Sequence, residues 1–174
     1  MKKETKKQLL IGAALVLELL FLLLYLNGRI DRLLDSDMSS EMILGQLLAR
    51  NNGILSDQWY YSTELRVLNT QLIYALFFRL SSNWHFVRMA STLVLWCVLI
   101  ASYGVLCRVM GCKKSFGVTA LLLAAPVSES YFRFVLAGVY YVPHLAIAFA
   151  ALALNEVYFK AQTDRKKFWL VVSV

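Results

Sequence analysis

The sequence predicts an all-α fold, a polytopic membrane helical bundle with two amphipathic surface helices in a long first outer loop. Of the 174 residues, 59% are hydrophobic and the mean hydropathy is +0.59, an apolar share above that of soluble domains. The apolar residues form runs long enough to cross a bilayer, and the basic residues cluster between these runs. The net charge of +7 therefore indicates membrane topology and argues against a nucleic-acid partner.

Four apolar stretches are candidate membrane spans, since crossing the hydrocarbon takes about 20 helical residues. They cover about 8–27, 86–107, 116–134 and 137–159, and a fifth begins at 168. Because the fifth is cut off at Val174, we expect residues 1–174 to be the amino-terminal part of one transmembrane domain. The first stretch resembles a signal peptide, but Tyr25–Arg29 is a poor cleavage site. We therefore expect an uncleaved signal anchor.

Three basic clusters set the expected orientation, because positive residues favour the cytoplasmic side. The clusters are Lys2, Lys3, Lys6 and Lys7; Arg108, Lys113 and Lys114; and Lys160, Arg165, Lys166 and Lys167. If all three are cytoplasmic, an even number of spans separates each pair. The short apolar run 68–80 then does not cross, and residues 28–85 form an outer loop. We expect an integral protein of a cytoplasmic or ER-type membrane, with its amino terminus in the cytoplasm.

The outer loop contains two expected surface helices. Asp37 is suited to cap a helix that runs to Arg50 and ends at Asn51-Asn52-Gly53. Its apolar stripe consists of Ile43, Leu44, Leu47 and Leu48, a pattern typical of a helix lying in the membrane plane. The second surface helix is expected at about 66–80.

An acidic group stands just after the first span, where a lipid headgroup would lie. It contains Asp35, Asp37 and Glu41, and the last two share a helix face because they are four residues apart. One interpretation is a general base, or a divalent-metal site, that faces a phosphorylated lipid. The other is helix capping, with acids favoured at a helix start by the helix dipole.

This organisation resembles the GT-C glycosyltransferases, which include the protein O-mannosyltransferases, the lipid A aminoarabinose transferase and the oligosaccharyltransferases. The resemblance covers about residues 8–160 and rests on the order of span, acidic motif, two surface helices and return span. It also includes Trp84-His85-Phe86-Val87-Arg88 at the start of the second span. One departure is Glu64-Leu65-Arg66, which lacks the proline of the Glu-Lys-Pro motif in the aminoarabinose-transferase branch.

The resemblance implies transfer of a sugar from a polyprenyl-phosphate donor to an acceptor on the outer face. It implies a catalytic role for Asp37, with Asp35 and Glu41 as further candidates. The implied substrate-binding residues are Glu64, Arg66, Arg88 and Arg133, the arginines neutralising the lipid phosphate. The implied metal ligands are Asp35, Asp37 and His144, although a single histidine at a helix start also fits an interface residue.

Two other classes of function stay open. A transporter or channel subunit would use Glu18, an acid in the middle of the first span, as a pathway residue. A non-catalytic membrane scaffold would need no site at all. The long outer segment between the first two spans favours the enzyme, since transporters seldom have one there.

Overall fold

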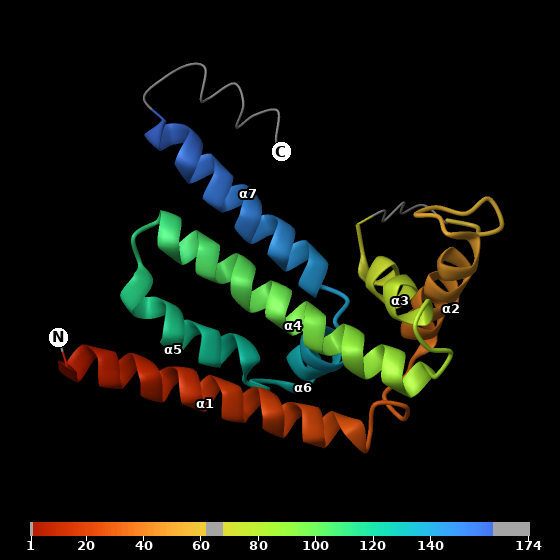
Figure 1. Ribbon diagram of the computed structural model, residues 1–174, viewed down its shortest axis with the longest axis horizontal. Helices are drawn as coiled ribbons and strands as arrows, with labels where there is room; N and C mark the ends of the chain where they lie inside the picture. The colour runs from red at the N-terminus through yellow and green to blue at the C-terminus, as the bar shows by residue number, and fades with distance from the viewer. Residues whose placement is uncertain (1, 62–67, 162–174) are drawn as a thin grey trace. The chain divides into compact units, whose positions relative to one another are not determined.

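The computed structural model describes residues 2–61 and 68–161, and all of its regular secondary structure there is helical. The all-α prediction is therefore confirmed, while the fifth apolar stretch lies outside the described residues. Along the chain the helices are α1 (Lys2–Asn27), α2 (Ser36–Asn51), α3 (Thr70–Phe78), α4 (Trp84–Val109), α5 (Lys113–Ala124), α6 (Glu129–Tyr131), the π-helix η1 (Phe132–Ala137) and α7 (Val142–Lys160) (Figure 1).

Three of these helices are long and apolar enough to cross a membrane. They are α1 from Thr5 to Asn27, the whole of α4 and the whole of α7. Their bounds agree with the stretches predicted at 8–27, 86–107 and 137–159. Helix α3, with nine residues, is only about 14 Å long. It is too short to span, as expected for the run 68–80.

The span predicted at 116–134 is interrupted in the structure. Helix α5 ends at Ala124 and α6 begins at Glu129. Pro126 explains the end, since a proline disfavours helical backbone in the residue before it. Ser128 explains the new start, because its side chain accepts a hydrogen bond from the Tyr131 amide at 3.1 Å. Counted as one interrupted span, the pair brings the number of candidate spans to four.

The chain divides into two compact units, and the first comprises residues 2–19, 97–125 and 144–161 of the described chain. Here α5 packs on α1 so closely that a Cβ atom on Gly117 would lie 2.5 Å from the Ile11 side chain. On the other side the Phe116 ring stacks on Tyr103 of α4, with 6.0 Å between ring centroids. The Lys160 ammonium of α7 donates to the Val109 carbonyl of α4 at 2.8 Å.

These contacts bring the basic ends of four helices together. Ile11 of α1 lies four residues after Lys7, and Gly117 of α5 lies four residues after Lys113. The contact between Ile11 and Gly117 therefore brings the basic starts of these two helices together. Lys160 ends α7, and its bond to Val109 places it beside the end of α4 that carries Arg108. The described members of the three basic clusters therefore lie at one end of this unit.

The second unit comprises residues 20–61, 68–96 and 126–143 of the described chain. Its centre is the packing of α2 on α3, which lie side by side (Figure 1). A Cβ atom on Gly45 would lie 2.7 Å from the Tyr74 Cβ, so only glycine allows this approach. Met42, Tyr74 and Val87 form a buried cluster beside it.

The buried face of α2 differs from the predicted stripe. Leu44 and Leu48 are buried as expected, but Ile43 is exposed, and Met38 and Met42 are buried instead. The face is rotated because α3 and α4 cover the methionine side. Helix α3 is also shorter than the 66–80 expected for it.

Candidate functional site

The acidic group lies at the amino terminus of α2, where the capping residue is Asp35 and not Asp37 as expected. Asp35 has extended backbone, and its Oδ1 accepts a hydrogen bond from the Met38 amide at 2.9 Å. Its carbonyl accepts another from the Ser39 hydroxyl at 2.7 Å. Asp37 lies in the first helical turn. Helix capping therefore explains Asp35 and does not explain Asp37.

Asp35 also binds a residue that the sequence does not single out. The Tyr140 hydroxyl donates a hydrogen bond to the same Oδ1. The pKa of Tyr140 is raised above its ordinary value, first by burial and then by this bond and the negative charges of Asp35, Asp37 and Glu41. The hydroxyl therefore stays protonated as a donor, and the three predicted acids lie around it.

Glu41 joins α2 to the start of α3. Its Oε1 accepts a hydrogen bond from the Asn69 side-chain amide at 2.8 Å, and its Oε2 accepts one from the Thr70 hydroxyl. The pKa of the buried Tyr74 is raised first by burial and then by the Glu41 charge. Glu41 is thus held by the fold, as Asp35 is, and both stabilise the position of α2.

Asp37 differs from both neighbouring acids. Its side chain is exposed, and within residues 2–61 and 68–161 no hydrogen bond or ion pair engages its carboxylate. The helix dipole favours a negative charge at this first turn. Asp37 is therefore an exposed ionisable group. The acids on either side of it in the sequence, Asp35 and Glu41, are both engaged in hydrogen bonds within the protein.

The structure places the expected phosphate-binding arginines in different settings. Arg88 is buried, with 2% of its surface exposed, and it donates to the Ile30 carbonyl and to the Met38 sulfur. Arg133 is exposed, and its guanidinium lies 4.0 Å from the Glu129 carboxylate. Arg66 and Glu64 lie outside the described residues. Of the described pair, only Arg133 is open to a ligand.

The expected metal ligands are divided between the two units. Asp35 and Asp37 belong to the second unit, whereas His144 belongs to the first. In the described part of the chain, no group of three histidine, cysteine, aspartate or glutamate side chains could hold a metal ion.

A second polar cluster joins the end of α1 to the start of α4. The His85 Nδ1 lies 2.9 Å from the Asp31 carboxylate, and its Nε2 lies 3.1 Å from the Asn27 side-chain oxygen. In the sequence, His85 stands out only as part of the motif at the start of the second span. The signal was its place at a helix start, but nothing in the sequence pairs it with Asp31, 54 residues away.

Comparisons with protein-family models, with curated proteins and with solved structures find no match to this chain. What the fold and the site define is a helical protein whose described residues include three helices of membrane-spanning length and apolarity. An acidic cluster lies at the amino terminus of α2, the helix that follows the first of these three.

Proposed function

We propose that the chain is part of a membrane glycosyltransferase that moves a sugar from a polyprenyl-phosphate donor to an acceptor hydroxyl on the outer face. The observation that supports it best is the exposed carboxylate of Asp37, which has no hydrogen bond or ion pair with any other residue of 2–61 and 68–161. It follows directly on the first candidate span, at the depth where a lipid phosphate lies. Asp35 and Glu41 beside it have structural partners that hold α2 in place.

In the proposed reaction Asp37 acts as the general base. It accepts the proton of the acceptor hydroxyl while the hydroxyl oxygen attacks the anomeric carbon of the sugar. The bond between that carbon and the phosphate oxygen breaks, and polyprenyl phosphate leaves with the electron pair. Arg133 neutralises the departing phosphate, and Asp37 then releases its proton to water.

The test compares Asp37→Asn and Asp37→Ala in the full-length protein, assayed for transfer from a lipid-linked donor. Because the cap is Asp35, both substitutions should leave protein abundance unchanged. Both should lower turnover on the order of a hundredfold or more, since neither provides a charged base. Asp57→Asn, at an exposed acid in the loop after α2, is the matched control. An Asp37→Asn variant that keeps its activity would reject the proposal.

One observation favours the alternative of a transporter or channel subunit. Glu18 lies in the middle of α1, and its Oε2 is buried without a hydrogen-bond partner among the described residues. An ionisable residue inside a span is costly and commonly marks an ion pathway. If this is the function, Glu18→Gln should abolish solute or ion flux in vesicles, whereas Asp37→Asn should not change it.

A further inference from the structure

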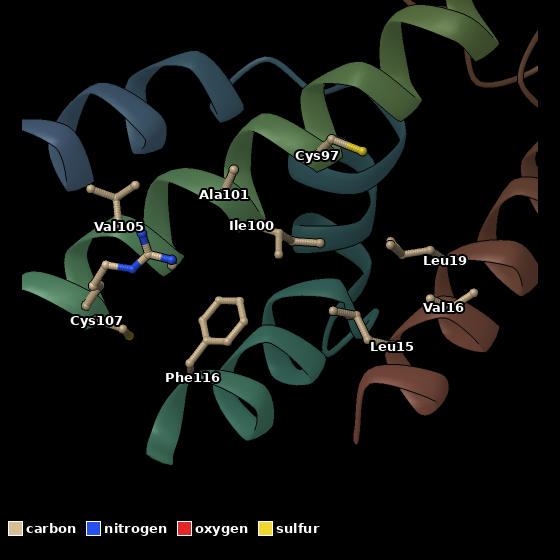
Figure 2. A pocket seen from close by; sticks show the side chains of 11 residues that line it. Leu15, Val16, Leu19, Cys97, Ile100, Ala101, Val105, Cys107 and Phe116 are labelled. Atoms are coloured by element: carbon tan, nitrogen blue, oxygen red, sulfur yellow. The ribbon is translucent and has the colours of Figure 1, made fainter. Parts of the chain in front are cut away.

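A groove of the first unit lies between α1, α4 and α5, with a volume of about 580 Å³. This is within the range of about 300–1,000 Å³ for sites that bind small molecules. Figure 2 shows Leu19 of α1 and Ile100 of α4 pointing toward one another across it, with the Phe116 ring of α5 on the same groove. Of the residues that line it, only Arg108 is charged.

The packing of α5 explains why the groove exists. Gly117 holds α5 against Ile11 of α1, and Phe116 lies against Gly104 of α4, where a Cβ atom would be 3.2 Å from the ring. Helix α5 therefore separates α1 from α4 at this level. Small side chains such as Ala101 then leave the space beside them unfilled.

The length of the groove fits an acyl chain. Its α4 wall runs from Cys97 to Arg108, about 16 Å at the helical rise per residue, which is half of the roughly 30 Å of hydrocarbon in a bilayer. An extended acyl chain that lies along this wall would reach one leaflet deep.

The charge of the groove indicates the headgroup. Arg108 lies in the last turn of α4, at the unit end that also carries the described basic residues of the other helices. A guanidinium there is suited to a phosphate at the membrane surface. We propose that this groove binds one acyl chain of an anionic phospholipid, with the phosphate at Arg108 and the chain end near Leu19.

The test uses the full-length protein in vesicles that contain phosphatidylglycerol or phosphatidylcholine spin-labelled near the end of one acyl chain. We expect a motionally restricted signal that favours phosphatidylglycerol about fivefold, the preference one basic residue provides. Arg108→Gln should abolish this preference, and Ala101→Phe should remove the restricted signal by filling the groove. The matched controls are Arg79→Gln and Ala151→Phe, at exposed positions outside the groove.

Two results would overturn the proposal. Equal restriction of both lipids, unchanged by Ala101→Phe, would mean that the lipid contacts only the general surface of the protein. No restricted signal at all, with Ala101→Phe lowering the thermal stability of the folded protein, would mean that protein fills the groove. Neither result bears on sugar transfer, because Arg108 and Ala101 belong to the unit that does not contain Asp37.

Discussion

The Tyr140 hydroxyl donates a hydrogen bond to the carboxylate of Asp35, a residue 105 positions earlier in the chain. The same carboxylate caps α2. The Asp35 side chain therefore caps α2 and also connects the start of α2 to the segment before α7.

The first prediction concerns the coupling between these two residues. Asp35→Ala should lose a cap of about 1 kcal/mol and a hydrogen bond to a charged group of about 1.5–3 kcal/mol. Tyr140→Phe should lose only the second contribution. The free energy of unfolding of both single variants and of the double variant should show a coupling of at least about 0.5 kcal/mol. Strictly additive effects would mean that the bond does not form in solution.

The second prediction is a loss of stability at alkaline pH. The pKa values of Tyr74 and Tyr140 are raised, mainly by burial, above the ordinary tyrosine value of about 10. As the pH rises, the unfolded state therefore loses these protons first. Their contribution to stability is complete below about pH 10 and falls above it.

Chemical denaturation between about pH 8 and pH 11 measures this effect. Replacing both tyrosines by phenylalanine should flatten the decline, because the variant has no hydroxyl to ionise at either position. Tyr60→Phe, at a residue that is 90% exposed, should keep the decline of the unsubstituted protein. An equal decline in all three proteins would contradict the prediction.

The third prediction concerns the different roles of Arg88 and Arg133. Arg88→Met should destabilise the protein by about 1–3 kcal/mol, because the Ile30 carbonyl loses its buried donor. Arg133→Gln should change stability by less than about 0.5 kcal/mol, as expected at an exposed site, but should lower sugar transfer if the proposed function holds. Thermal unfolding and transfer assays on the same preparations make the comparison. A stable Arg88→Met protein would show that Arg88 is not needed to hold Ile30 and Met38.

The fourth prediction tests the topology. Ser82 is exposed between α3 and α4, and the native Cys112 is exposed between α4 and α5. In a background lacking the other cysteines, an impermeant maleimide should label Ser82→Cys in intact cells. It should label Cys112 only after the membrane is opened. Labelling of both from the same side would overturn the expected crossing of α4.

The spans were predictable from the sequence because composition over about 20 residues determines them, whatever the neighbours are. Pro126 and Ser128 are both local signals of the helix break. The apolar run around them favoured an uninterrupted span, so the break was not predicted. The cap was ambiguous, because Asp35 and Asp37 are equally good capping residues. What decides between them is the hydrogen bond from Tyr140 to Asp35. A contact between residues 105 positions apart produces no periodic pattern from which the sequence could predict it. The burial of Arg88 depends on Ile30 and Met38 in the same way.

The interruption after α5 has a consequence for hydration. Helix α5 has 12 residues and is about 18 Å long, little more than half of the roughly 30 Å hydrocarbon thickness. If Lys114 lies at one surface, the backbone from Ala125 to Ser128 lies deep in the bilayer. Carbonyls that end a helix there find no donor among lipid tails, and each costs several kcal/mol unless protein covers it or water reaches it. A membrane that holds this chain therefore has to admit water, or further polypeptide, at a depth where acyl chains would otherwise be continuous.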